Sequence, residues 1–172
     1  MLFRSNDTSL LNLDTLTRNS VICASFLHDI GHLIGMQNND PIMQDINTFN
    51  GASLGIVGHE GIGSAYLHDL GFPAIVCNLV FNHVASKRYL CTTKPGYINN
   101  LSDASKETMK LQGGLMTSSE ITNFQNDSIT SWQLKIKIRE YDDMAKNKNC
   151  NTDWTDFFNH QLKPILESVL IS

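Results

Sequence analysis

The stretch that decides the fold spans residues 21–33 and has the sequence VICASFLHDIGHL. Its first seven residues are apolar or small, which is typical of a buried helix, and His28, Asp29 and His32 follow. Neighbouring helical side chains point about 100° apart, so His28 and Asp29 can reach one cation, with His32 one turn further along the same face. Burying an imidazole and a carboxylate is costly unless they are paired or bound to a metal. The stretch predicts a helix that ends in metal ligands; the alternative is a polar helix end with a core histidine.

Length and composition predict a single globular domain over residues 1–172. Hydrophobic residues make up 41% of the chain and charged residues 17%, which excludes a disordered protein. The net charge of −4 gives no basic surface for nucleic acid, and no apolar run approaches the roughly 20 residues of a membrane span. The start has no signal-peptide core. The four cysteines form no C-x-x-C pair, so we expect reduced thiols in a cytoplasmic protein.

Outward from the first stretch, the spacing of apolar residues predicts helices and no strand, which makes the fold class all-α. The expected helices span residues 21–33, 59–70, 73–90, 102–111, a short segment after 117, 130–147 and 153–170. Asn19 or Ser20 is expected to cap the first helix, and Pro164 is expected to kink the last. Residues 35–58 are polar and predict a long loop.

Two further histidines, His59 and His83, lie in apolar helical segments. A lone histidine in such a place is more often a core residue than a ligand. A metal needs more than two ligands, however, so the pair His28 and Asp29 makes both histidines candidates. The two histidines in polar stretches are expected at the surface: His68 and His160.

Two cationic side chains lie one helical turn from candidate ligands. Lys87 follows His83 by four residues, and Arg139 precedes Asp142 by three. A lysine or an arginine beside a metal suits phosphate or phosphonate oxygens. The alternatives are a lysine that extends to solvent and an ordinary intrahelical ion pair. Asp143 competes with Asp142 for the ligand position.

The candidate ligands are three imidazoles and two carboxylates: His28, Asp29, His59, His83 and Asp142. Such a set suits iron, manganese or zinc rather than an iron–sulfur cluster. Two metals bridged by Asp29 can clamp an oxyanion and activate water, whereas redox-active iron in the same place can activate O₂. The residues alone leave both chemistries open.

Several longer strings resemble the HD-domain superfamily, an all-α fold of metal-dependent phosphohydrolases and a few di-iron oxygenases. They are LHDIGHL (27–33), HEGIG (59–63), HVASKRYL (83–90), LSDASKET (101–108), QGG (112–114) and REYDD (139–143). The first is shared across the superfamily, whereas HVASKRYL and LSDAS are more specific. Over about residues 21–146 the chain is most similar to oxygenases of the 2-amino-1-hydroxyethylphosphonate dioxygenase type. These enzymes use O₂ and a mixed-valent Fe(II)/Fe(III) pair to cleave a carbon–phosphorus bond.

This resemblance implies a role for each matching residue. The iron ligands would be His28, Asp29, His59, His83 and Asp142, with Asp29 as the bridge. The substrate pocket would be formed by His32, Lys87, Ser105, Thr108 and Arg139, and the catalytic residues would be Asp29 and His32. The implied cofactor is two iron ions, with manganese or zinc as alternatives. The implied partners are O₂ and a small 1-hydroxyphosphonate, from which phosphate is released.

The stretch before His28 departs from this resemblance, because HD-domain proteins carry a further histidine ligand there and no histidine precedes His28. We therefore expect an incomplete first helix or a lost ligand, with exposed core and self-association. Three functions are compatible with the sequence, in this order: the phosphonate oxygenase, an HD-domain phosphohydrolase, and a degenerate HD module that binds metal without turnover. The substrate substituent, the oligomeric state and the role of residues 36–58 stay open.

Overall fold

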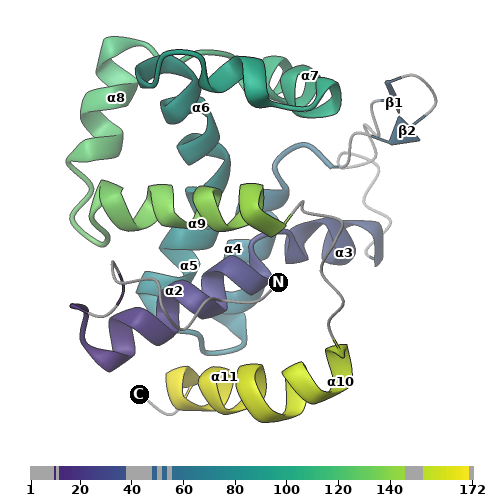
Figure 1. Ribbon diagram of the computed structural model, residues 1–172, viewed down its shortest axis with the longest axis vertical. Helices are drawn as coiled ribbons and strands as arrows, with labels where there is room; N and C mark the ends of the chain where they lie inside the picture. Colours follow the sequence, from purple (N-terminus) through teal and green to yellow (C-terminus); the bar gives the residue numbers. More distant parts are fainter. Residues whose placement is uncertain are drawn as a thin grey trace.

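The computed structural model describes residues 10, 12–37, 48–49, 52–53, 56–145 and 153–170. In this part of the chain the fold is all-α, as the sequence predicts, and it is consistent with an HD-type helical bundle (Figure 1). The helices are α2 (Thr15–Leu27), α3 (Ile30–Gln37), α4 (His59–Asp69), α5 (Ala74–Phe81), α6 (His83–Thr93), the 3-10 helix η1 (Tyr97–Asn100), α7 (Asp103–Leu111), α8 (Ser118–Gln125), α9 (Trp132–Ala145), α10 (Trp154–Phe157), the π-helical turn η2 (Phe158–Leu162) and α11 (Lys163–Leu170).

A short antiparallel pair lies within the expected loop, where no strand was predicted. It consists of β1 (Thr48–Phe49) and β2 (Ala52–Ser53), with Thr48 opposite Ser53. Strands of two residues are too short to give an alternating pattern, which is why the sequence does not predict them.

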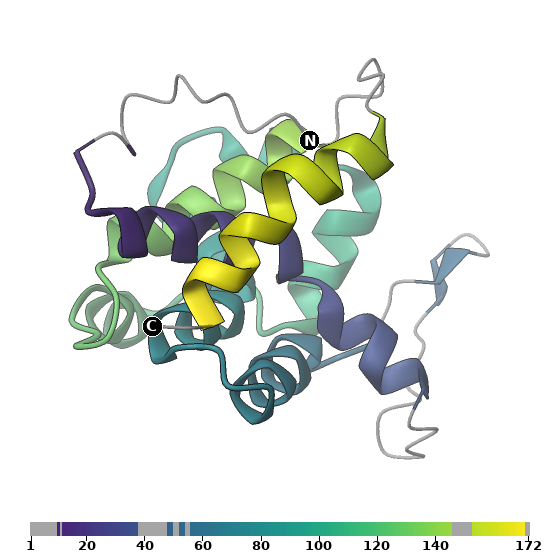
Figure 2. The same cartoon turned by 90° about the horizontal axis from the view of Figure 1, so that it is seen from below.

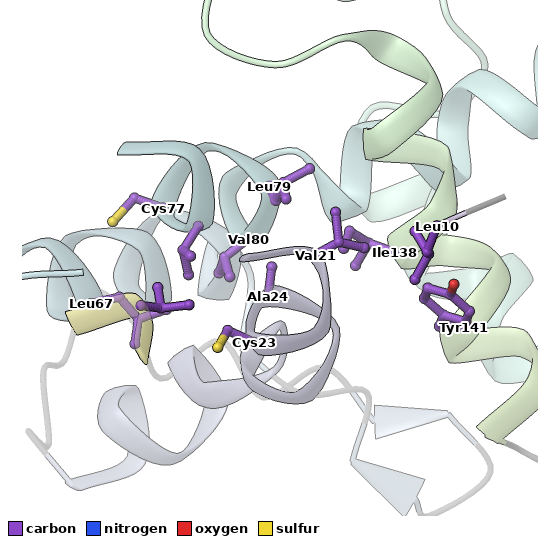
Figure 3. Close-up of a cluster of buried hydrophobic side chains, with 12 residues drawn as sticks. Leu10, Val21, Cys23, Ala24, Leu67, Cys77, Leu79, Val80, Ile138 and Tyr141 are labelled. Carbon is purple, nitrogen blue, oxygen red and sulfur yellow. The ribbon is translucent and has the colours of Figure 1, made fainter. Parts of the chain in front are cut away.

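Helix α2 lies in the main core, packed against α5, α9 and α11 (Figures 1 and 2). Its Val21, Cys23 and Ala24 are completely buried, in one cluster with Val80 of α5 and Ile138 of α9 (Figure 3). Burying a valine or isoleucine side chain contributes about 1.5–3 kcal/mol. This packing fixes the end of α2 relative to the helices that carry the other candidate site residues.

A second cluster joins α6, η1, α8 and α9, and its aromatic members include Tyr89 and Phe124, with 4.8 Å between ring centroids. Beside it, the fully buried Lys135 of α9 places its Nζ 2.7 Å from Asp127 Oδ2 and 3.1 Å from the carbonyl oxygen of Phe124. Because a buried ammonium is costly without a partner, this ion pair ties the start of α9 to the segment after α8.

The prediction of one continuous helix over residues 21–33, capped by Asn19 or Ser20, is wrong in both its cap and its continuity. Helix α2 begins earlier than expected, because the Asp14 carboxylate accepts a hydrogen bond of 2.9 Å from Thr17 N. The α-helix is then interrupted by a turn at His28–Asp29, and α3 follows. The break lets α3 approach α4 so closely that a Cβ on Gly31 would lie 1.9 Å from the carbonyl oxygen of His59. Packing between two helices thus overrides a continuous helical pattern.

The predicted helix 73–90 is also divided, at Asn82, into α5 and α6. Asn82 Nδ2 donates a hydrogen bond of 2.9 Å to the carbonyl oxygen of Asn78, which also accepts the backbone N–H of Asn82 at 3.0 Å. Because of this division, His83 begins α6 and does not lie inside a helix.

Other helix ends are confirmed. His59 begins α4, Ser102 caps α7, Thr117 and Glu120 form the capping box of α8, and Asp153 caps α10. At the position of the expected kink, the π-helical turn η2 directly precedes Lys163 and Pro164, because proline has no N–H to offer the preceding turn.

None of the described helices is long and apolar enough to cross a membrane. Cys23, Cys77 and Cys91 are free thiols, as expected, and Cys150 lies outside the described residues. The expectations for residues 1–9, and most of those for residues 36–58, also fall outside the described part of the chain.

Candidate metal centre and substrate cavity

Three helix ends bring three imidazoles to one place. His28 is the C-cap of α2, His59 is the first residue of α4, and His83 is the first residue of α6. In each ring Nδ1 lies within hydrogen-bond distance of the carbonyl oxygen three residues earlier, at 2.9, 2.9 and 2.7 Å respectively. A ring whose Nδ1–H donates to a carbonyl keeps its Nε2 lone pair for a metal.

The Asp29 carboxylate lies between two sets of donors. Its Oδ2 is 3.3 Å from His28 Nε2, which in turn is 3.8 Å from Asp142 Oδ1 on α9. Its Oδ1 is 3.6 Å from the Nε2 atoms of both His59 and His83. This second set is compact, since one ligand atom from each of Asp29, His59 and His83 lies within 4.8 Å of the other two. Asp29 therefore has one oxygen facing each set.

The Nε2 atoms of His59 and His83 face each other at 2.9 Å. Desolvation by burial lowers the pKa of both imidazoles, that of His83 well below its usual value, so both rings are neutral at pH 7. With both Nδ1 protons directed at carbonyls, each Nε2 presents a lone pair, and two lone pairs at this distance repel. A cation beside them removes the repulsion, so the residues present fit a bound metal ion.

The surrounding charges keep Asp29 ionised. Burial alone would raise the pKa of this carboxyl, but the hydrogen bond and charge of His28 lower it well below its usual range. For His28 the balance is reversed: burial lowers the pKa, but Asp29 and Asp142 raise it overall. The centre therefore holds an ionised carboxylate among the imidazoles at neutral pH, which suits a metal site.

His32 on α3 differs from the other three rings. It stacks on His59 with 3.7 Å between ring centroids, and its Nδ1 accepts a hydrogen bond of 3.1 Å from Ile56 N. The neutral ring therefore carries its proton on Nε2, where it can donate to an oxygen of a bound molecule. Desolvation and the neighbouring His59 lower the pKa of His32 to about 4, so the ring is neutral near pH 7.

Two buried cations reach the same site from α6 and α9. Lys87 Nζ donates hydrogen bonds to Thr108 Oγ1 at 3.1 Å and to Gln112 Oε1 at 2.6 Å. The Arg139 guanidinium donates through Nη1 to Asp142 Oδ2. Two cations at one buried site favour an anionic ligand, and charge-assisted hydrogen bonds to oxyanions are the strong ones.

A cavity of about 160 Å³ connects these groups. All ten site residues that the sequence singles out line it: His28, Asp29, His32, His59, His83, Lys87, Ser105, Thr108, Arg139 and Asp142. Val84 and Gln112 also line the cavity. The cavity thus combines a metal-binding region with a cationic, hydroxyl-bearing region in one space. The two histidines predicted at the surface, His68 and His160, are exposed.

Asp143, the competitor of Asp142, has different partners. Its Oδ1 accepts a hydrogen bond of 2.5 Å from Arg139 Nη2, and its Oδ2 accepts one of 2.5 Å from the Tyr97 hydroxyl. Asp142, in contrast, has its Oδ1 directed towards His28. The geometry therefore favours Asp142 over Asp143 as a metal ligand.

Comparison with known proteins identifies relatives of the chain, although no protein-family model matches it. The chain is 34% identical over 146 residues to hydroxymethylphosphonate dioxygenase of Gimesia maris, which is 85% of this chain and 67% of that enzyme. The chain belongs to a family of phosphonate dioxygenases. A second family member, 1-hydroxy-2-(trimethylamino)ethylphosphonate dioxygenase (glycine-betaine-forming) of Leisingera caerulea, is 35% identical over 135 residues, or 77% of this chain and 61% of that enzyme.

A further relative is an uncharacterized protein of Acanthamoeba polyphaga mimivirus, 43% identical over 129 residues, which is 75% of this chain and 54% of that protein. The chain therefore spans about half to two thirds of the length of the relatives that it matches.

Two groups in or beside this cavity were not assigned from the sequence. Gln112 had a usable signal. Thr108 follows Ser105 by three residues and Gln112 follows Thr108 by four, so the three lie on one helical face. Tyr97 had none, since it lies in a turn and reaches Arg139 only through the tertiary fold.

Proposed function

We propose that this phosphonate dioxygenase relative is a single HD-type domain that uses O₂ and two iron ions to cleave the carbon–phosphorus bond of a small 1-hydroxyphosphonate. The observation that carries the proposal is the position of Asp29, whose two carboxylate oxygens face two different donor sets. One carboxylate between two sets of donors suits a two-metal centre, and mixed nitrogen and oxygen ligands suit iron. The activities named for the two enzyme relatives support the same reaction class.

In this proposal the cationic region of the cavity binds the phosphonate. Lys87 and Arg139 supply charge-assisted hydrogen bonds, each contributing about 1.5–3 kcal/mol when made to a charged oxygen. Ser105 and Thr108 add hydroxyl donors from α7, and both line the same cavity. The phosphonate then lies at one end, with the hydroxyl-bearing carbon towards Asp29.

His32 holds a proton at Nε2 and donates it as a hydrogen bond to a substrate oxygen, because its Nδ1 is taken by Ile56 N. His28, Asp29, His59, His83 and Asp142 hold the metals. Bound iron supplies O₂ activation and the oxidising power. In the overall reaction the hydroxyl-bearing carbon leaves as a carboxylate and the phosphorus as phosphate, so that each product gains one oxygen atom of O₂ and the carbon-bound hydrogen leaves as a proton.

The test is phosphate release by the iron-loaded chain with and without O₂. Hydroxymethylphosphonate and 2-amino-1-hydroxyethylphosphonate are the two substrates, and the O₂ consumed is measured in the same vessel. We expect one phosphate for each O₂, and none under anaerobic conditions. The variant Asp29→Asn, which keeps the shape of the side chain but removes its charge, should release none.

The other two functions give different results in the same assay. A phosphohydrolase would release phosphate from a phosphate monoester equally well without O₂. A metal-binding module without turnover would bind iron and release nothing from any of these compounds. Either result would overturn the proposal.

A further inference from the structure

All three nitrogens of the Arg139 guanidinium donate hydrogen bonds to neighbouring side chains. Its side chain is only 7% exposed, and each of its three nitrogens has a partner. Nε donates to the Tyr97 hydroxyl at 2.9 Å, Nη2 donates to Asp143 Oδ1 at 2.5 Å, and Nη1 donates to Asp142. The Tyr97 hydroxyl in turn donates to Asp143 Oδ2 at 2.5 Å, which closes a ring of three residues.

This ring determines how Arg139 can bind Asp142. A guanidinium prefers to bind a carboxylate with two parallel hydrogen bonds, and such a fork would occupy both oxygens of Asp142. Tyr97 and Asp143 occupy Nε and Nη2, so that only Nη1 is directed at Asp142. Asp142 Oδ1 then remains directed towards His28 Nε2, at 3.8 Å.

The charges around Arg139 support the same arrangement. One guanidinium lies between two carboxylates, those of Asp142 and Asp143. Asp143 supplies the counter-charge that a buried guanidinium requires, because an uncompensated buried charge is very costly. Because two carboxylates share the charge of one guanidinium, these three groups together carry one net negative charge, which a bound metal ion would offset.

We propose that Asp143 and Tyr97 are positioning residues, which hold Arg139 by its Nε and Nη2 so that Asp142 can bind a metal beside His28. This inference rests on the two-metal centre of the proposed function. Neither residue lines the cavity, and each would act through Arg139.

The first experiment is a titration of the metal-free 172-residue chain with Mn²⁺, followed by calorimetry, which requires no turnover. In Asp143→Asn the carboxylate that holds Nη2 loses its charge, and Arg139 can then bind both oxygens of Asp142. We expect the affinity for the ion beside His28 and Asp142 to fall roughly 10- to 100-fold. The other ion, at Asp29, His59 and His83, binds as in the unchanged chain. The matched control is Glu140→Gln, which removes one carboxylate of α9 that pairs with Lys137 outside the cavity.

The second experiment uses a smaller change. Tyr97→Phe removes only the hydroxyl that orients Nε, and we expect the same ion to bind roughly fivefold more weakly, the equivalent of one hydrogen bond. Its control is Tyr89→Phe, a buried tyrosine of the same hydrophobic cluster whose hydroxyl accepts a hydrogen bond from Gln125 at 2.7 Å. If Asp143→Asn does not fold, Tyr97→Phe decides the question by itself.

Three results would overturn the inference: binding of a single ion by the unchanged chain, equal metal affinities for Tyr97→Phe and Tyr89→Phe, or equal weakening of both ions in Asp143→Asn. Failure of the proposed function has a different signature. A chain that binds two ions with the predicted variant pattern, but releases no phosphate with O₂, supports the positioning role and contradicts the oxygenase.

Discussion

His59 and His83 point their Nε2 atoms at each other at 2.9 Å, although each ring has its Nδ1 directed at a backbone carbonyl and burial keeps both rings neutral. Such a contact is unfavourable without a cation, since neither nitrogen has a proton to donate. The fold therefore holds two imidazoles, together with Asp29, in an arrangement that a metal ion stabilises.

Metal binding should consequently raise the stability of the chain. At a free metal concentration of 100 times the dissociation constant, the free energy of unfolding rises by about 2.7 kcal/mol. The variant His83→Gln should lose the part of this increase that comes from the ion at Asp29, His59 and His83, while its metal-free stability changes much less, because the substitution also removes the repulsion with His59. Thermal unfolding with Mn²⁺ and with EDTA measures both effects, and the exposed His68→Gln is the control. An equal metal-dependent increase in His83→Gln would contradict the assignment.

The anion site gives a second prediction. Lys87 is buried and makes hydrogen bonds to Thr108 and Gln112. Lys87→Met keeps the length of the side chain and removes the charge, so the affinity for inorganic phosphate should fall roughly 10- to 100-fold. Stability should change little, because replacing a buried charge by an apolar side chain relieves desolvation.

The control for this charge removal is Lys110→Met, at a position on α7 that is 67% exposed and paired with Glu107. Isothermal titration with phosphate gives both affinities. Unchanged phosphate binding in Lys87→Met would mean that the cationic region of the cavity is not an anion site.

The contact between α3 and α4 gives a third prediction. A Cβ on Gly31 would lie 1.9 Å from the carbonyl oxygen of His59 and 2.8 Å from Gly63 N, and neither backbone atom can move aside alone. Gly31→Ala should lower the free energy of unfolding by about 3 kcal/mol or more, since overpacking forces the backbones apart.

The matched substitution on α4 is Gly61→Ala, where an added Cβ meets nothing within 4 Å. It should raise the free energy of unfolding by about 0.4–1 kcal/mol through the entropy of the unfolded chain. Urea unfolding of both variants measures the contrast, and equal effects of the two substitutions would refute the close approach of the helices.

The local sequence was sufficient for the helix class and several helix ends, because these depend on residues within one turn of each other. His59 at a helix start and the capping box of Thr117 and Glu120 are examples. The breaks at His28–Asp29 and Asn82 were not predictable in this way. The apolar pattern continues through both positions and so does not mark either break, and at His28–Asp29 the break accompanies the close approach of α3 to α4.

The roles of Asp142 and Asp143 show the same limit at the site. The two carboxylates are adjacent and chemically identical, so spacing alone left them as competitors. The difference between their roles depends on Tyr97, which lies more than forty residues away in the sequence and contacts Arg139 from η1. A contact of this kind follows from the tertiary fold and has no periodic signal.

The buried pair of Asp127 and Lys135 gives the last prediction. Burial alone would raise the pKa of Asp127, but the hydrogen bond from Lys135, helped by those from Ile129 N and Asn78, lowers the pKa from its usual value to about 2. A carboxyl with a lowered pKa in the folded state stabilises the fold above its unfolded-state pKa, and this stabilisation is lost as the pH falls through the folded-state pKa.

Asp127→Asn should therefore lower the free energy of unfolding at pH 7 by about 3 kcal/mol, because Lys135 stays buried without its counter-charge. The difference from the unchanged chain should shrink between pH 4 and pH 2, where Asp127 itself becomes protonated and the two proteins come to carry the same uncompensated ammonium. Asp69→Asn, at a side chain that is 82% exposed, should show no such convergence. Unfolding by urea at pH 7, 4 and 2.5 measures the three differences. A difference for Asp127→Asn that is independent of pH would show that packing, and not the ion pair, connects α9 to the segment after α8.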